Sequence, residues 1–141
     1  MRIATVVRLS LGLLAASVSF SAHAWEPADK AGIRKVIREQ MQAISRTDSV
    51  VFASTVAPGL RSQFPNEDAL YGVLVGKIPA LEGAREFGFG PLKTTSVGLV
   101  QTLRFTDASG NPWVSMFVME QQDGRWFVKG VSAKQVTAQK L

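Results

Sequence analysis

The stretch MEQQDGRWFVKGV, residues 119–131, holds two apolar runs on either side of Asp123 and Gly124. An Asp-Gly pair in such a position is a strong signal for a β-hairpin, because both central residues of the tight turn need a positive φ. With these two residues in the turn, Gln122 pairs with Arg125. The stretch therefore predicts the last two strands of an antiparallel sheet.

The turn also fixes the register further along the two strands. It places Met119 opposite Val128 and Phe117 opposite Gly130, where the missing side chain leaves room for the phenyl ring. One face of the hairpin is then expected to pack on helices, and it carries Trp113, Ser115, Phe117, Met119, Trp126 and Val128. The outer face remains apolar and carries Val114, Met116, Val118, Phe127 and Val131, mixed with Glu120 and Lys129.

Two further strands are predicted before the hairpin. Residues 98–107 alternate between two faces with the period of two that is typical of a strand, and Gln101 shares a face with Leu103. Residues 85–95 predict a weaker strand, and the glycines that interrupt it favour a place at an edge of the sheet. The expected sheet has about four strands.

The residues before the sheet have a helical pattern instead. Apolar residues recur at steps of three and four between residues 27 and 45, which predicts an amphipathic helix with one face on a core. Asp48 is placed to cap a short second helix that ends at Pro58, and Asn66 is placed to cap a third helix that Pro79 ends. The chain thus combines three N-terminal helices with an antiparallel sheet.

The N-terminus has the pattern of a secretory signal peptide. Arg2 and Arg8 precede an apolar run that ends at Phe20, and small residues in A-x-A spacing follow up to Ala24. The run is shorter than the ~20 residues that a membrane-spanning helix needs. We therefore expect cleavage after Ala24, a periplasmic or secreted protein, and no insertion into the membrane.

On this interpretation, residues 1–24 are the signal peptide and residues 25–141 form a single domain. A chain of that length can bury one hydrophobic core and is too short for two. Because the sequence contains no Cys, the exported domain must be stabilised by its core and not by disulfides.

The missing residue types exclude several kinds of chemistry. The only His of the sequence, His23, lies in the predicted signal peptide, so the mature chain has neither an imidazole nor a thiol. Cys-His and Ser-His-Asp catalysis are thereby excluded, as are zinc sites built from His and Cys. We expect no metal and no cofactor. These absences argue against an enzyme, except one that uses carboxylate, Tyr and backbone groups.

Charge does not indicate a nucleic-acid partner. Of the 16 Lys and Arg residues, two lie in the predicted signal peptide, so the mature chain has 14 basic residues against 11 acidic ones and a net charge of +3. The basic residues are scattered, whereas a nucleic-acid interface needs them clustered on one face. We expect no nucleic-acid partner.

The order of three helices and a curved antiparallel sheet resembles the nuclear transport factor two-like class, which includes ketosteroid isomerase-like and SnoaL-like proteins. Within this class the chain is similar to a family of uncharacterised exported bacterial proteins, a domain of unknown function. The likeness is carried by residues 37–64, Tyr71, residues 110–120 and residues 124–131. It implies an α+β fold in which the helices pack on the sheet as a cone-shaped, cystatin-like roll. The open end of the cone is often a ligand pocket, and the outer sheet face often makes a dimer.

The resemblance does not extend to the isomerase apparatus, in which a pocket carboxylate acts as base and a Tyr with a protonated acid binds the oxyanion. Tyr71 is the sole Tyr, and it lies on the third predicted helix, whereas isomerases keep theirs on the first. Among the acids of the sheet segments, Glu120 is predicted on the outer face and Asp107 and Asp123 in turns. Only Glu86 is placed to reach a pocket.

No residue is therefore assigned a catalytic or metal-binding role. The pocket-lining candidates are Tyr71, Gln101, Trp113, Ser115 and Trp126, although a buried Tyr that bonds internally and Trp side chains that simply fill the core are the commoner cases. The candidates for a homodimer interface are Val114, Met116, Val118, Phe127 and Val131, since monomers rarely expose an apolar patch of that size.

Three classes of function fit these observations. The first, which we favour, is an exported non-enzymatic binding module that holds a small apolar molecule or a peptide segment in a cone-shaped pocket. The second is an envelope-associated structural or interaction protein that acts through its sheet surface. The third is an enzyme of isomerase or hydratase type that uses carboxylate and Tyr groups. Whether the cone is open or filled by its own side chains separates them best.

Overall fold

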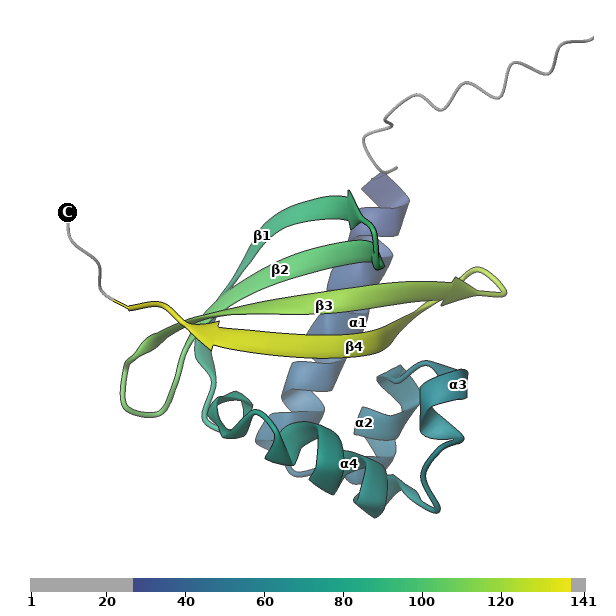
Figure 1. Ribbon diagram of the computed structural model, residues 1–141, viewed down its shortest axis with the longest axis horizontal. Helices are drawn as coiled ribbons and strands as arrows, with labels where there is room; N and C mark the ends of the chain where they lie inside the picture. The colour runs from purple at the N-terminus through teal and green to yellow at the C-terminus, as the bar shows by residue number, and fades with distance from the viewer. Residues whose placement is uncertain (1–26, 138–141) are drawn as a thin grey trace, which may run out of the picture.

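A computed structural model of the protein describes residues 27–137, and the predicted signal peptide lies outside the described residues. The chain forms helices first and then an antiparallel sheet (Figure 1). The helices are α1 (Pro27–Ser45), α2 (Ser49–Thr55), α3 (Pro58–Arg61), α4 (Glu67–Gly76) and the 3₁₀ helix η1 (Pro79–Leu81). The strands are β1 (Arg85–Thr95), β2 (Gly98–Thr106), β3 (Pro112–Gln122) and β4 (Arg125–Gln135).

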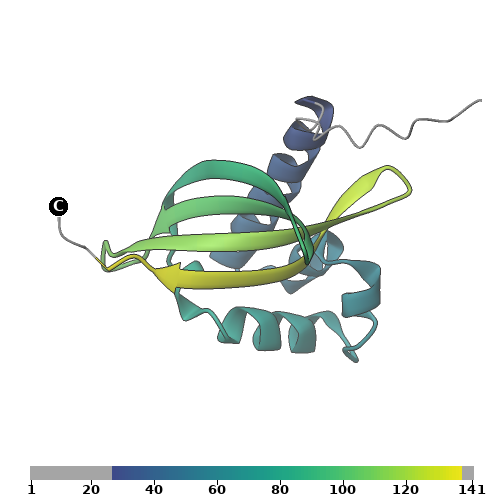
Figure 2. The ribbon, with the colours of Figure 1, turned by 45° about the horizontal axis from the view of Figure 1, so that its top comes forward.

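The sheet has the order β1-β2-β3-β4, and all neighbouring strands are antiparallel. It arches over α1, which crosses its concave face, while α2, α3 and α4 lie beside β4 (Figures 1 and 2). The predicted α+β class and the four-stranded sheet are confirmed. No helix within residues 27–137 is long and apolar enough to cross a membrane.

The two predicted helix caps are present. The Asp48 carboxylate accepts a hydrogen bond from the backbone N–H of Val51 at 3.1 Å, and the Asn66 side chain accepts one from Ala69 at 2.8 Å. Pro58 differs from the prediction, because it begins the short helix α3 and does not end α2. Proline suits a first helical position, where its fixed φ is favourable and its missing N–H would have no partner within the helix.

The core lies between α1 and the concave face of the sheet and continues beneath α2 and α4. Its members come from every layer of the fold, and the largest fully buried apolar side chains are Ile33, Ile37, Val56, Leu70, Val75, Leu103 and Phe117. At the β1 edge of the sheet, the guanidinium carbons of Arg34 and Arg38 lie 5.2 and 5.0 Å from the ring centre of Phe89. These contacts hold the irregular edge strand β1 against α1.

The hairpin turn forms as predicted. Asp123 and Gly124 both have positive φ, at 51° and 76°, and Met119 pairs with Val128. Positive φ at both positions gives the tight turn whose twist matches that of the two strands.

Beyond this point the predicted register is wrong, because β4 contains a β-bulge opposite the step from Val118 to Met119. Lys129 is the extra residue, so Gly130 pairs with Val118 and Val131 pairs with Phe117. Since side chains alternate between the faces of a strand, one extra residue moves all that follow it to the opposite face. Gly130 therefore lies on the outer face and Val131 on the inner face, the reverse of the prediction.

Candidate functional site

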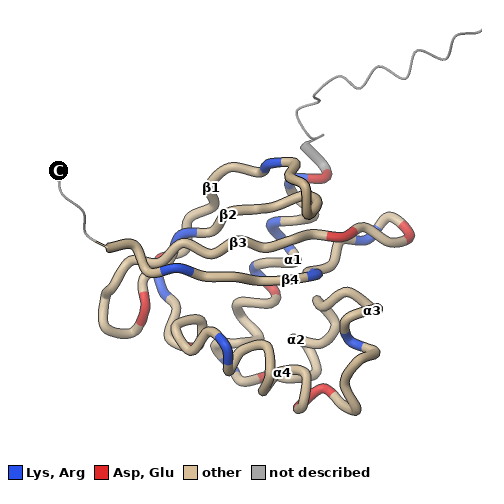
Figure 3. The backbone as a smooth tube through the Cα atoms, viewed as in Figure 1, with Lys and Arg blue, Asp and Glu red and all other residues tan. Residues whose placement is uncertain are grey.

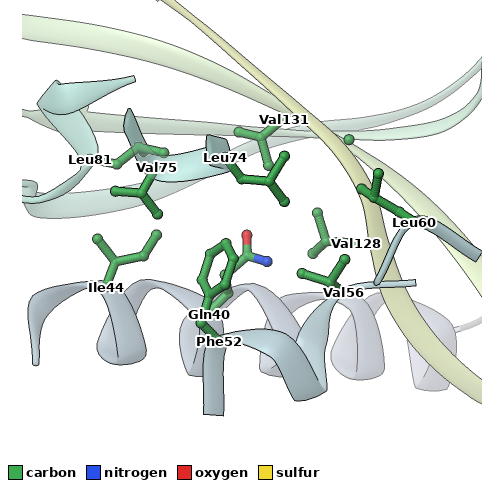
Figure 4. A pocket seen from close by; sticks show the side chains of 11 residues that line it. Gln40, Ile44, Phe52, Val56, Leu60, Leu74, Val75, Leu81, Val128 and Val131 are labelled. Carbon is green, nitrogen blue, oxygen red and sulfur yellow. The ribbon is translucent and has the colours of Figure 1, made fainter. Parts of the chain in front are cut away.

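A cavity of about 40 Å³ lies between the helices and β4, inside the cone (Figure 4). We call it the Gln40 cavity. It is lined by Gln40, Ile44, Phe52, Val56, Leu60, Leu74, Val75, Leu81, Val128, Gly130 and Val131. All of the lining side chains except Gln40 are apolar. The cavity is thus a hydrophobic space with a single amide in its wall.

The Gln40 amide is held in one orientation. Gln40 is 1% exposed, and its Nε2 donates a hydrogen bond of 2.9 Å to the hydroxyl oxygen of Thr55. That hydroxyl has one hydrogen, which it donates to the carbonyl oxygen of Phe52 at 2.6 Å. The oxygen of Thr55 must therefore accept from Gln40, which requires the NH₂ group of the amide on this side.

The amide oxygen consequently points into the cavity, toward Leu74 and Val131 (Figure 4). It is buried and has no hydrogen-bond partner among the described residues. A buried acceptor without a partner costs about 1–3 kcal/mol, so such groups are rare and call for an explanation. A water molecule held here would find apolar side chains around it, whereas buried waters usually have two to four polar partners.

The far side of the cavity is formed by side chains that are only partly buried. Leu60, Leu74 and Val131 are half-buried and come from α3, α4 and β4. The helix α4 packs mainly on α2, not on the sheet. Rotation of these side chains can therefore enlarge the cavity without breaking backbone hydrogen bonds of the sheet.

The five pocket candidates from the sequence do not line this cavity. Tyr71 donates from its hydroxyl to the carbonyl oxygen of Ile44 at 3.2 Å and packs edge-on against Phe52, with ring centres 5.2 Å apart. Burial raises the pKa of the Tyr71 phenol above its usual value. Tyr71 thus satisfies its hydroxyl internally, behind the wall of the cavity.

Gln101 and Ser115 are fully buried but serve the sheet itself. Gln101 Nε2 donates to the carbonyl oxygen of Gly90 at 2.9 Å and so ties β2 to the irregular part of β1. Its Oε1 is a second buried oxygen without a partner among the described residues, but it does not face the Gln40 cavity. The Ser115 hydroxyl donates to the carbonyl oxygen of Leu103 at 3.0 Å.

The two tryptophans of the inner face lie elsewhere in the core. Trp113 is half-buried, donates from Nε1 to the Asp107 carboxylate at 2.9 Å, and stacks on Phe105. Trp126 is buried against α1, where its ring would lie 3.0 Å from a Cβ added to Gly32. Neither ring lines the cavity.

Glu86, the acid expected to reach a pocket, does not contribute to this site. It is exposed, at the irregular start of β1, and has a positive φ of 54°. No carboxylate lines the Gln40 cavity. No Lys, Arg, Asp or Glu is among the buried residues of the described chain. Lys and Arg are spread along α1, the loops and the strands (Figure 3).

The expected dimer face is smaller than the sequence suggests. Val131 belongs to the inner face and lines the cavity. Phe127 is 7% exposed, and the Arg125 guanidinium carbon lies over its ring, 5.2 Å from the ring centre. The remaining candidates lie on the outer face, where Met116 is 49% exposed between the half-buried Val114 and Val118.

Sequence reasoning missed Gln40, although a signal for it exists. Gln40 follows Ile33 and Ile37 and precedes Ile44 at steps of three and four, so it lies on the buried stripe of the first helix. A polar residue in such a stripe needs a partner inside the fold.

A solved structure agrees with this fold. The chain is similar to an NTF2-like protein of unknown function from Shewanella baltica OS155, with a TM-score of 0.53 and 12% identity over 79% of this chain and 96% of that one. For Aln2 from a Streptomyces species the TM-score is 0.49 and the identity 15%, over 78% of this chain and 92% of that one. A comparison with curated proteins gives no match. Residues 26–141 match the family described as domain of unknown function DUF4864, and the chain belongs to this family.

Proposed function

We propose that the protein is an exported, non-enzymatic binding module that holds a small apolar molecule in the Gln40 cavity. One observation carries this proposal: an amide oxygen without a partner among the described residues, inside an otherwise apolar space. Small-molecule sites have this composition, with mostly apolar walls and few polar groups that orient the ligand. The cavity lining offers no carboxylate, phenol, thiol or imidazole that would transfer a proton, which disfavours the isomerase or hydratase alternative.

The volume of about 40 Å³ is well below the ~300–1,000 Å³ of typical ligand pockets. Ligand entry therefore requires Leu60, Leu74 and Val131 to move outward. Toluene is a suitable first probe, because it is apolar and small. We expect toluene to shift the methyl resonances of Ile44, Leu74 and Val131 in a saturable way, and to leave the methyls of Val97 unchanged, since Val97 is 63% exposed.

A pair of variants tests whether toluene binds inside the cavity. Val131→Phe fills the cavity and should abolish the saturable shifts, whereas Val114→Phe adds the same ring to the outer face and should leave them intact. The absence of saturable shifts in the wild-type protein, or their persistence in Val131→Phe, would refute binding in this cavity.

Export is the part of the proposal that rests on residues 1–24. A protein with this leader should be recovered outside the cytoplasm with Trp25 as its first residue. Intact-mass measurement of the envelope fraction tests this, and recovery of the uncleaved chain would contradict it.

The second candidate is an interaction protein that acts through its outer sheet face as a homodimer. The observation in its favour is the exposure of Met116 between two valines on the face opposite the cavity. A two-fold contact lets one such patch bury itself against its copy. Sedimentation at micromolar concentration should show a dimer that Met116→Lys converts to a monomer. A parent chain that is already monomeric removes this candidate.

A further inference from the structure

We infer that the ligand of the Gln40 cavity is a neutral molecule with an apolar body and one hydrogen-bond donor, a hydroxyl or N–H group directed at Gln40 Oε1. This inference rests on the proposed function and adds the chemical class of the ligand. It follows from the fixed orientation of one amide, the lack of charge around it, and the shape of the space in front of it.

The donor is required because the orientation of Gln40 is not free. Thr55 accepts from Nε2 and donates its own hydrogen to Phe52, so the amide presents its oxygen to the cavity. That oxygen can only accept. An ether, ketone or carboxylate oxygen would face it oxygen to oxygen, while a hydroxyl or N–H group satisfies it.

Neutrality follows from the lining of the cavity. Besides Gln40, the lining consists of apolar side chains and the backbone of Gly130, and it contains no charged group. A charged ligand would lose its hydration and gain no opposite charge, which is strongly unfavourable. Ionised carboxylate ligands are excluded on both counts, since they bring a negative charge and an acceptor.

The position of Gln40 also fixes the direction of binding. Gln40 is 1% exposed, whereas Leu60, Leu74 and Val131 at the opposite side are half-buried. The donor group therefore lies at the deep end, and the apolar body extends between these three side chains toward the surface. Short alcohols, phenols and small heteroaromatic N–H compounds have this form.

Phenol, toluene and benzoate test this inference, because they share a ring and differ in one group. Phenol carries a donor, toluene a methyl group of similar size, and benzoate a charged acceptor. The dissociation constants of all three are measured for the wild-type protein, for Gln40→Met and for Gln42→Met. Gln42 lies on the exposed side of α1 and provides the matched control.

We expect the ratio of toluene to phenol dissociation constants to fall about ten-fold in Gln40→Met, the effect of losing one hydrogen bond to a buried acceptor. The ratio should stay unchanged in Gln42→Met. Because the same two ligands are compared in each protein, the difference between their hydration free energies cancels when the ratios are compared. Benzoate should not compete with phenol for the cavity.

A measurement on the wild-type protein covers the case in which Gln40→Met does not fold. The carbonyl ¹³Cδ resonance of Gln40 should shift with phenol and not with toluene, since only phenol donates to it. The inference is overturned if the ratio of the toluene and phenol dissociation constants in Gln40→Met equals the wild-type ratio. It is also overturned if phenol and toluene shift the Gln40 resonance equally, or if benzoate competes with phenol. If neither phenol nor toluene enters the cavity, the proposed function itself fails.

Discussion

Asp107 holds together the loop that joins β2 to β3. Its carboxylate accepts hydrogen bonds from the indole Nε1 of Trp113 and from the backbone N–H groups of Ser109 and Asn111, each at 2.9 Å. These donors, the indole first, lower the pKa of the Asp107 carboxyl below its usual value. Because they favour the ionised form, these hydrogen bonds stabilise the loop more strongly while Asp107 is charged.

This pKa shift predicts a pH dependence. A carboxyl whose pKa is lower in the folded state stabilises the fold above its unfolded pKa, and this contribution is lost as the pH falls through the folded pKa. We expect Asp107→Ala to lower the urea midpoint at pH 7 and to have a much smaller effect at about pH 2. The exposed acid Glu82 offers a control through Glu82→Gln. An equal loss for Asp107→Ala at both pH values would show that the bonds do not depend on charge.

Gly130 provides a test of the strand register, because the bulge at Lys129 determines which face of the sheet Gly130 lies on. A Cβ added to Gly130 would lie 3.9 Å from Val118 on the outer face, an ordinary van der Waals contact. We expect Gly130→Ala to change the free energy of unfolding by no more than about 0.5 kcal/mol. On the inner face, Ser115→Leu should cost about 1–3 kcal/mol through overpacking, since Ser115 is fully buried. Comparable losses in the two variants would favour the register without the bulge.

The role of Gln40 can be predicted from the sequence only in part. Its place on the buried stripe of the first helix can be deduced from spacing alone. The partner of its NH₂ group, Thr55, comes from another helix and is found only by packing the two helices together. The direction of the amide oxygen depends on that contact, so the sequence does not predict the acceptor in the cavity.

At the scale of elements, the N-cap of α2 positions the helix that supplies Phe52 and Thr55 to the site. The Asp48 carboxylate bonds the N–H of Val51 at 3.1 Å. We expect Asp48→Ala to destabilise the protein by about 1 kcal/mol, and Asp48→Asn, which retains a cap, to cost less. Chemical denaturation measures both. A negligible effect of Asp48→Ala would mean that packing alone holds the helix start.

Most of the elements follow from local signals, and the bulge in β4 is the main exception. The turn at Asp123 and Gly124 and the caps at Asp48 and Asn66 depend on side chains that act within a few residues, so they are predictable. A bulge has no such signature. The extra residue Lys129 in β4 exchanges the faces of Gly130 and Val131.

At the scale of the whole molecule, the cone is nearly filled by its own side chains. Within the cone, the candidate pocket residues from the sequence lie in the core or the sheet, and the Gln40 cavity of about 40 Å³ lies under β4. The bulge that sends Val131 inward completes the wall of that space. The fold therefore belongs to the class expected from the sequence. The cavity, in contrast, depends on the bulge in β4, which the sequence does not predict.

The proposal that the Gln40 cavity opens to admit a neutral hydrogen-bond donor can be tested with a crystal structure of the protein with phenol. We expect the ring between Leu60, Leu74 and Val131, the hydroxyl within hydrogen-bond distance of Gln40 Oε1, and the Nε2 bond to Thr55 preserved. A structure in which phenol lies only on the surface, or in which a well-bonded water occupies the cavity and excludes phenol, would contradict the claim.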